Sequence, residues 1–346
     1  MRTKEKIKKS IAWLLCKMGV DALWRYFNQD QLLIVTYHGL YSKFNRKSLP
    51  LFTHLHVDLF REHLKLYKKY YHVVSLAELE NCVREGSPWP EKSLLITFDD
   101  GFKNNYEVAF PVLKEFELPA AVFLTVDYIG SDQLLWFDEL FVLLKQCLES
   151  EISRDLIADC IGWRPDSRNV EEQYPKCANR FKRKSVIERK GRMARLKKLL
   201  HEDESSELLE HFRMLSWEQV LEMKSSGLVQ FGVHTATHRI VSNLSGEEWE
   251  KEIVIPKGKM EGILKCSIDT FCYPNGIIGV DFLSEHEAYL EENGYVCAFC
   301  TNENLNMSET NLYRLGRVSV GSGITSDIHY LRLKTAGVIK WLKSKY

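Results

Sequence analysis

The stretch Ser93–Gly101, SLLITFDDG, joins an apolar run typical of a buried strand to two adjacent carboxylates and a glycine. Burial in a core explains the apolar run, but it does not explain Asp99 and Asp100. Successive strand side chains point to opposite faces, so two adjacent Asp at a strand end face different surroundings and can take different roles. Gly101 permits a sharp exit from the strand. The alternative is that the pair only caps a helix predicted over residues 104–117, since Asp is a favoured N-cap residue.

Strand-like and helix-like segments alternate on both sides of this stretch, which is typical of parallel βαβ units. From 131 to about 215 no strand-like run occurs, and the chain is rich in helix formers and charge. About eight βα units interrupted once predict one α/β barrel-like domain over residues 31–325, with a helical insertion at about 131–215 and a closing helix over 326–346. The predicted strands lie at 31–38, 71–76, 93–98, 120–126, 228–234, 268–273, 295–301 and 312–320.

The first 30 residues predict an amphipathic helix. Its apolar residues recur at helical spacing, and lysines are available for the polar face. We expect the apolar face to pack on the body of the protein; contact with an anionic membrane surface is the alternative. The apolar residues are Ile7, Ile11, Leu14, Leu15 and Met18, and the lysines are Lys4, Lys8, Lys9 and Lys17.

Composition narrows the possible partners and location. The 346 residues carry no net charge, which gives no argument for nucleic acid. The nine cysteines are odd in number and scattered, which is typical of reduced thiols in a cytoplasmic protein. No apolar run reaches the roughly 18–20 residues of a spanning helix. We therefore expect a cytoplasmic protein, with a peripheral position on the inner face of the membrane as an option.

A block of basic residues lies inside the predicted insertion. Between Lys176 and Leu200 there are eleven Lys or Arg against the single acidic residue Glu188. Such a block is usually a solvated helical face. The alternative is contact with the phosphates of a lipid-linked substrate or with a membrane surface.

Three polar features fall at the ends of predicted strands, where α/β folds place their sites. They are Asp99-Asp100, His234-Thr-Ala-Thr-His238 and Tyr273-Pro-Asn-Gly276. Two histidines four residues apart and one carboxylate supply three protein ligands and leave positions open, as in catalytic zinc sites. A bound metal acidifies its water, and the second carboxylate can act as general base. A backbone N–H of the Tyr273–Gly276 turn, that of Asn275, can stabilise an oxyanion.

These motifs, in this order, resemble those of the polysaccharide deacetylase family with the NodB homology domain, a carbohydrate esterase family. The resemblance rests on Thr97-Phe-Asp-Asp-Gly101, His234-Thr-Ala-Thr-His238 and Phe271-Cys-Tyr-Pro-Asn-Gly276. It implies a distorted (β/α)7-8 barrel that removes N- or O-acetyl groups from sugar polymers with a divalent metal, commonly zinc. Carried over, Asp99 is the catalytic base, and the metal ligands are Asp100, His234 and His238.

The sequence departs from the family pattern at two places. The Arg that usually stands two residues before the Pro of the third motif is Cys272 here. The strand that matches the last motif carries Arg and lacks the His that usually serves as general acid. Arg cannot release a proton near neutral pH, so we expect Arg317 to orient Asp99 or to neutralise the oxyanion. The first candidate for the acid is His38, at a strand end, although a capped or core His explains that position equally well. Asp138 is the second.

Further residues are predicted to contact the substrate. The segment Trp136-Phe-Asp-Glu-Leu140 resembles one found in deacetylases of bacterial surface-polysaccharide assembly. Trp136 can stack on a sugar ring, with Asp138 beside it, although a buried helix face explains Trp136 almost as well. Tyr273, Pro274 and Asn275 are expected to border the same site.

The combined hypothesis is a metal-dependent deacetylase, with zinc as the expected metal, that acts on amide bonds other than peptide bonds. Its expected substrate is a cell-envelope polysaccharide or its lipid-linked precursor, thus an acetylated amino-sugar polymer or a lipid-linked glycan. One alternative is deformylation or deacetylation of a single lipid-linked sugar. Another is a catalytically silent, metal-containing sugar-binding protein, which the missing Arg and His motivate.

Overall fold

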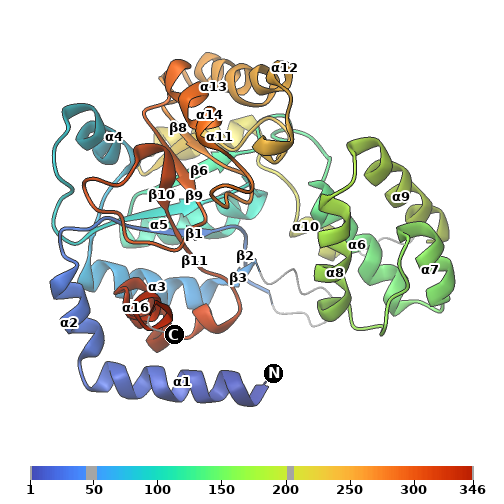
Figure 1. The fold of residues 1–346 in the computed structure, drawn as a ribbon, viewed down its shortest axis with the longest axis horizontal. Coiled ribbons are helices and arrows are strands. Elements are labelled where there is room, and N and C mark those ends of the chain that lie inside the picture. The colour runs from blue at the N-terminus through green and yellow to red at the C-terminus, as the bar shows by residue number, and fades with distance from the viewer. Residues whose placement is uncertain (1, 44–52, 201–205, 345–346) are drawn as a thin grey trace. The chain divides into compact units, whose positions relative to one another are not determined.

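Eight strands form one parallel sheet in the order β10-β9-β8-β7-β6-β5-β1-β11, and β4 pairs with β5 outside this path (Figure 1). The edge strands β10 and β11 are separated in the chain only by Arg317, so the sheet nearly closes into a barrel. The predicted α/β barrel is confirmed in this computed structural model, which describes residues 2–43, 53–200 and 206–344. The strands are β1 (Leu33–Tyr37), β4 (His72–Val73), β5 (Ser93–Phe98), β6 (Ala120–Leu124), β7 (Val229–Val233), β8 (Thr270–Cys272), β9 (Cys297–Cys300), β10 (Leu315–Gly316) and β11 (Val318–Ser319).

Helices follow most strands, as the alternating pattern predicts. Several of them begin with a capping box, for example at Ser75 and at Ser216. A short two-stranded sheet pairs β2 (Leu40–Tyr41) with β3 (Leu55–His56). The helices are α1 (Arg2–Lys17), α2 (Val20–Phe27), α3 (Val57–Tyr70), α4 (Leu76–Glu85), α5 (Phe110–Phe116), α11 (Trp217–Ser225), α12 (Gly246–Trp249), α13 (Ile255–Leu264), α14 (Ser284–Glu292), α15 (Ile328–Thr335) and α16 (Val338–Lys343).

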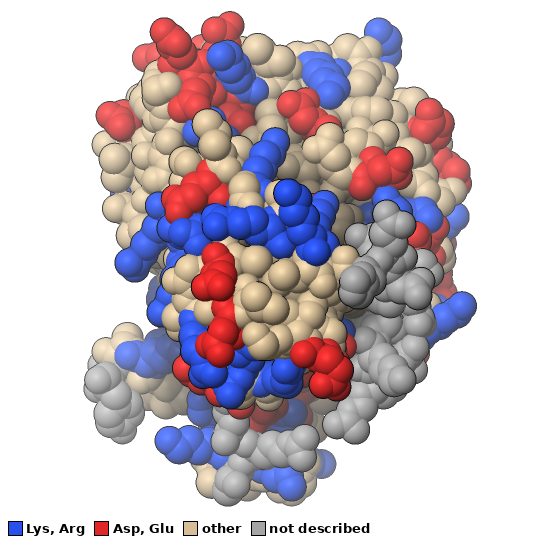
Figure 2. Space-filling view, turned by 90° about the vertical axis from the view of Figure 1, so that its right-hand side faces the viewer, with Lys and Arg blue, Asp and Glu red and all other residues tan. Residues whose placement is uncertain are grey.

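The structure divides into two compact units, and Gln133–Arg213 belongs to the second. That segment is helical. Figure 2, a view turned by 90° from that of Figure 1, shows a band of Lys and Arg side chains. Several cations of the segment pair within it; Lys184 and Arg192, for example, both contact Glu188. Among the described residues, no helix combines the length and apolar character needed to cross a membrane. The helices of the segment are α6 (Trp136–Glu149), α7 (Arg154–Ile161), α8 (Val170–Lys182), α9 (Val186–Leu199) and α10 (Ser206–Glu210).

Three predicted elements are interrupted in the structure. The strand predicted over 312–320 begins with a short 3-10 turn and then splits into β10 and β11, because one half pairs with β9 and the other with β1. The predicted N-terminal and C-terminal helices each divide in two. Both divisions occur at a glycine with left-handed backbone, Gly19 (φ 76°) and Gly337 (φ 90°).

The prediction that the apolar stripe of α1 packs on the body is wrong for most of its residues. The helix contacts α15 through the small side chains of Ala12 and Cys16, which cluster with Leu333 and Ala336. Leu15 is half-buried at the edge of this cluster. The small side chains let the two helices approach closely, so the contact forms on a different face. The exposed residues are Ile7, Ile11, Leu14 and Met18.

The barrel interior is filled by strand side chains that alternate with outward-facing ones. Phe123 of β6 and Phe299 of β9 meet with ring centroids 5.0 Å apart. The guanidinium of Arg317 lies 5.9 Å from the centre of the Phe123 ring. The apolar core therefore reaches up to the polar groups at the carboxyl ends of the strands.

Candidate active site

The carboxyl ends of β5, β7 and β8 bring the three polar motifs to one end of the barrel. Asp99 and Asp100 follow β5, His234 follows β7, and Tyr273 follows β8. In the sheet, β5 and β7 flank β6, and β8 lies next to β7. Residues about 135 positions apart in the sequence therefore become neighbours, because the carboxyl ends of parallel strands lie at the same end of the barrel.

Asp100, His234 and His238 form a group whose ligand atoms lie within 4.8 Å of one another. The Nε2 atoms of His234 and His238 lie 3.5 Å and 3.3 Å from Oδ1 of Asp100. Nδ1 of His234 donates to the carbonyl oxygen of Cys272 at 2.8 Å, which leaves the lone pair of Nε2 facing Asp100. Burial lowers the pKa of His234 to about 4, so its imidazole is neutral near pH 7.

This group fits a divalent metal ion. Oδ1 of Asp100 is buried and makes no hydrogen bond, although the carboxyl lies almost entirely out of solvent. A buried, unsatisfied carboxylate oxygen is costly unless a cation completes its surroundings. The donor set of two imidazoles and one carboxylate is that of catalytic zinc sites. The three residues predicted as ligands are thus brought together in a form that can hold a metal.

Strained backbone accompanies the same residues. Asp100 (φ 73°), Thr235 (φ 63°) and His238 (φ 57°) all have left-handed backbone, which non-glycine residues rarely adopt. Gly101 follows Asp100 with φ 88°, as expected from the sharp exit. Such strain persists where surrounding structure holds it, and it concentrates at functional sites.

Asp99 forms a buried bidentate pair with Arg317. Nη1 and Nη2 of Arg317 each donate to one carboxylate oxygen of Asp99 at 2.7 Å. The same guanidinium also donates to the hydroxyls of Thr36 and Thr97 at 3.1 Å and 3.3 Å. Burial alone would raise the pKa of Asp99, but the charge and hydrogen bonds of Arg317 hold it well below its usual range. Of the two roles predicted for Arg317, the structure shows the contact that orients Asp99.

Cys272 lies beside this pair, with Sγ 3.7 Å from Oδ1 of Asp99. It stands where the resemblance places an Arg, and its thiol is fully buried. Arg317, which enters from the junction of β10 and β11, supplies the guanidinium that position 272 lacks. The absence of an Arg at position 272 is therefore compensated by Arg317, which comes from the junction of two other strands.

His38, the first candidate for the general acid, lies near both carboxylates. It follows β1, is half-buried, and contributes to the lowered pKa of Asp99 and of Asp100. Its carbonyl oxygen accepts a hydrogen bond from Nδ2 of Asn105 at 2.7 Å. The side chain of Asn104 accepts from the backbone N–H of Leu40 at 2.9 Å. Two asparagines just after the Asp-Asp-Gly motif thus hold the segment that carries His38.

Glu252 is a site-supporting residue that the sequence did not reveal. It is buried in a π-helical turn (Glu250–Val254) and accepts hydrogen bonds from N–H and Oγ1 of Thr237 at 2.9 Å and 2.5 Å. Its carbonyl oxygen accepts from the N–H of Ala236 at 3.1 Å. This residue fixes the loop between His234 and His238, yet nothing distinguishes it in the sequence from other Glu of a charged helix.

The Tyr273–Gly276 turn contributes backbone, not an aromatic surface. The ring of Tyr273 is fully buried and stacks on Phe282 with centroids 3.7 Å apart, so the substrate contact predicted for this residue is wrong for its side chain. Pro274 is buried as well. Asn275 has left-handed backbone (φ 60°), and its carbonyl oxygen accepts from Thr301 Oγ1 at 2.5 Å. Stabilisation of an oxyanion by the backbone N–H of Asn275 stays a prediction.

Trp136 and Asp138 begin helix α6 of the second unit. The guanidinium of Arg189 lies 4.5 Å from the centre of the Trp136 ring. Asp138 is buried, and its charge adds to the burial that raises the pKa of Tyr174. Contact of either residue with a sugar stays a prediction.

Comparison with known proteins assigns the sequence to a family. The family described as "Polysaccharide deacetylase" matches residues 86–297. The poly-beta-1,6-N-acetyl-D-glucosamine N-deacetylase of Escherichia coli (strain K12) is 40% identical over 73 residues, which are 20% of this chain and 11% of that protein. The protein of the same name from Staphylococcus epidermidis is 39% identical over 66 residues, which are 19% of this chain and 22% of that protein. The chain thus aligns with only a small part of these relatives.

Two solved structures show a similar fold. IcaB from Ammonifex degensii superposes with a TM-score of 0.55 at 19% identity, over 89% of this chain and 97% of that chain. The Streptococcus pyogenes deacetylase PplD, in complex with acetate, superposes with a TM-score of 0.55 at 16% identity, over 86% and 95%. The match of the family over residues 86–297, more than half of the chain, together with the barrel itself, places this chain in the polysaccharide deacetylase family.

Proposed function

We propose that this chain is a metal-dependent hydrolase that removes N-acetyl groups from an acetylated amino-sugar polymer. The observation that carries the proposal is the Asp99–Arg317 pair directly beside the group of Asp100, His234 and His238. The names of the relatives from Escherichia coli and Staphylococcus epidermidis support an N-acetylglucosamine polymer as substrate. Zinc is the proposed metal, since imidazole and carboxylate ligands in this number suit it.

Different residues of the chain then have different roles in the proposed reaction. A divalent metal held by Asp100, His234 and His238 would polarise the acyl carbonyl and acidify a bound water. Arg317 keeps Asp99 ionised and fixes its orientation, so that Asp99 can accept the proton of the attacking water.

Two further roles complete the proposed reaction. His38 donates a proton to the departing amine, supported by its place near both carboxylates. The N–H of Asn275 stabilises the oxyanion. O-acetyl groups and a lipid-linked precursor of the polymer fall within the same chemistry.

The structure weakens one motive for the alternative of a catalytically silent sugar-binding protein. The Arg absent at position 272 is replaced in space by Arg317, which contacts Asp99 through both nitrogens. A silent protein has no need of a buried guanidinium that orients a carboxylate. For location we propose the cytoplasm, supported by nine cysteines that all remain free thiols.

The test is acyl release by the purified chain with its metal content measured in parallel. With oligomers of N-acetylglucosamine, we expect acetate release that depends on added zinc and stops in Asp100→Asn, which also loses the metal. Asp127→Asn is the matched control, because the exposed carboxylate of Asp127 pairs with Lys259 on the surface and the substitution leaves its backbone unchanged. Formate release from an N-formyl sugar in place of acetate would favour the deformylase alternative. Metal binding without any acyl release would favour the silent protein.

A further inference from the structure

The outer face of α1 carries an apolar stripe that no other described element covers. Ile7, Ile11, Leu14 and Met18 are 54%, 52%, 52% and 70% exposed. They are spaced by four, three and four residues, so they form one line along the helix. The opposite face holds Ala12 and packs on α15. In Figure 1, α1 runs along the lower edge of the drawing with no other ribbon element below it.

The next helix adds apolar side chains at the same corner of the barrel unit. Leu23, Tyr26 and Phe27 of α2 are 50%, 64% and 64% exposed. With Trp13, which is 48% exposed, eight large apolar side chains are exposed between residues 7 and 27. Single exposed apolar residues are normal on soluble proteins, but eight on two successive helices and their junction mark an interaction surface.

Lysines border the stripe on both sides. With about 100° of rotation per residue, Lys4 and Lys8 lie on one flank of the stripe, and Lys6 and Lys17 lie on the other. All four are exposed. The only carboxylate of α1, Glu5, is 3.1 Å from Lys9 on the inner side. Among the described residues of α1, the outer face thus combines apolar and cationic groups without a carboxylate. A partner that binds this face is therefore expected to supply negative charge.

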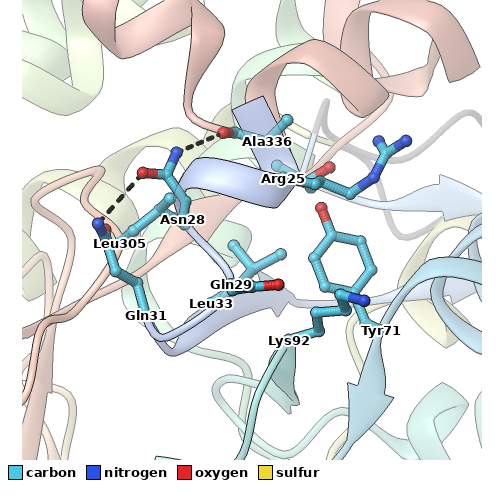
Figure 3. Close-up of a pocket in the computed structure, with 10 residues that line it drawn as sticks. Arg25, Asn28, Gln29, Gln31, Leu33, Tyr71, Lys92, Leu305 and Ala336 are labelled. Atoms are coloured by element: carbon cyan, nitrogen blue, oxygen red, sulfur yellow. Dashed lines mark hydrogen bonds between the residues drawn. The ribbon is translucent and has the colours of Figure 1, made fainter. Parts of the chain in front are cut away.

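An open groove of about 440 Å³ lies beside α2 and continues this charge pattern. Its described lining includes the three cations Arg25, Lys69 and Lys92 and no carboxylate. Arg25 stacks on Tyr70 with its guanidinium 4.2 Å from the ring centre. A small cavity of about 10 Å³ adjoins it, and Figure 3 shows Arg25, Tyr71 and Lys92 on one side of that cavity.

We propose that the face formed by α1 and α2 docks on the surface of an anionic lipid bilayer. The apolar stripe lies at the boundary of headgroups and acyl chains, the flanking lysines contact the headgroup phosphates, and the groove takes one headgroup. A second copy of this chain suits the face less well, because the stripe of the copy would bring four more lysines and no free carboxylate. The proposal is independent of the proposed deacetylase activity.

Vesicle flotation of the full chain tests this proposal. We expect the protein to float with vesicles of phosphatidylcholine mixed with phosphatidylglycerol, not with phosphatidylcholine alone, and to detach as salt screens the charges. The double variant Ile11→Asp, Leu14→Asp should lower the partition coefficient by at least about tenfold. Lys69→Glu should lower it by roughly fivefold. Ile255→Asp on α13, a site 55% exposed, is the matched control and should bind as wild type does.

Three outcomes would overturn the proposal. They are absence of wild-type binding to anionic vesicles, equal binding by the double variant, and a stable dimer in light scattering that Ile11→Asp dissociates. Thermal unfolding of each variant shows whether it folds. Hydrolysis of a soluble oligosaccharide by the double variant should match wild type, so a failure of this proposal is distinguishable from a failure of the deacetylase proposal.

Discussion

Asp99 and Asp100 are neighbours in the sequence, yet the structure gives them different partners. Asp99 pairs with Arg317, whereas Asp100 turns toward two histidines through left-handed backbone. We therefore expect Asp99→Asn to lower kcat by roughly 10²–10⁴-fold, the usual contribution of a general base. Metal content should stay at the wild-type level, because Asp100 keeps its place. Steady-state kinetics together with elemental analysis checks both statements, and full activity in this variant would refute the role of Asp99.

Arg317 acts on the reaction through Asp99 and not through the substrate, since it is fully buried. Arg317→Lys keeps the charge but loses the bidentate contact that a guanidinium makes with a carboxylate. We expect kcat to fall by about tenfold or more while KM changes little. A raised KM at unchanged kcat would instead indicate that Arg317 contacts the sugar.

The sequence predicted those site residues that directly follow buried strands and whose polar side chains core packing does not explain. Asp99, Asp100, His234 and His238 fall in this group. For Arg317 the sequence left two roles open, to orient Asp99 or to neutralise the oxyanion. It does not show that the side chain of Arg317 will contact Asp99 at the end of another strand. It missed Glu252 and Asn105, since their function lies in hydrogen bonds to backbone and to Thr237, which leave no pattern in the residue types.

At the scale of elements, the loop from His234 to His238 depends on a helix that follows it. Glu252→Gln removes the charge that accepts from Thr237. We expect metal affinity to fall by about 10–100-fold, the usual effect of losing a supporting contact, while the melting temperature without metal changes little. Titration calorimetry with zinc measures this. Glu250→Gln, an exposed neighbour on the same turn, is the control and should bind zinc normally.

A buried carboxylate joins α2 to α15. Asp21 accepts from Arg25 at 2.7 Å and from Arg332 at 2.7 Å and 2.9 Å. Burial would raise the pKa of Asp21, but the two arginines lower it below the ordinary value of 3.8. Its contribution to stability is therefore complete above pH 3.8 and is lost as the pH falls through the lower folded-state pKa.

Asp21→Asn should accordingly lower the free energy of unfolding by about 3 kcal/mol near pH 7, because it leaves buried cations without their charge partner. It should also reduce the loss of stability on acidification. Urea unfolding at several pH values checks this, with exposed Asp30→Asn as the control. An unchanged pH profile would show that Asp21 does not link the two helices energetically.

The helix α1 shows what periodicity alone leaves undecided. The spacing of Ile7, Ile11, Leu14 and Met18 predicts a helix with an apolar stripe, and the helix is present. Which face meets the protein depends on the close fit of Ala12 and Cys16 to α15, a tertiary contact with no periodic signature.

At the scale of the whole molecule, the barrel closes through the residue that orients the catalytic base. Arg317 stands between β10 and β11, the two edges of the sheet, and its guanidinium reaches hydroxyls on β1 and β5. The parallel sheet and its barrel-like form were predictable from the alternating pattern, whereas the place of β4 outside the main strand order was not. The point at which the sheet closes was also not predictable, because a two-residue strand on each side of an arginine looks the same in sequence as one continuous strand.

Metal binding should therefore depend on folding of the whole barrel. The ligands come from two strand ends that are brought together only when β5, β6 and β7 are paired, so the unfolded chain lacks the site. A metal that binds only the folded state stabilises it by about 2.7 kcal/mol at a free concentration of 100 times its Kd. We expect zinc to raise the melting temperature of the wild-type chain and a chelator to reverse the rise. His238→Asn should abolish the shift, because His238 is the most exposed of the three ligands (11%) and its loss removes a donor with little change to the core. Equal shifts in wild type and His238→Asn would place the metal elsewhere on the chain.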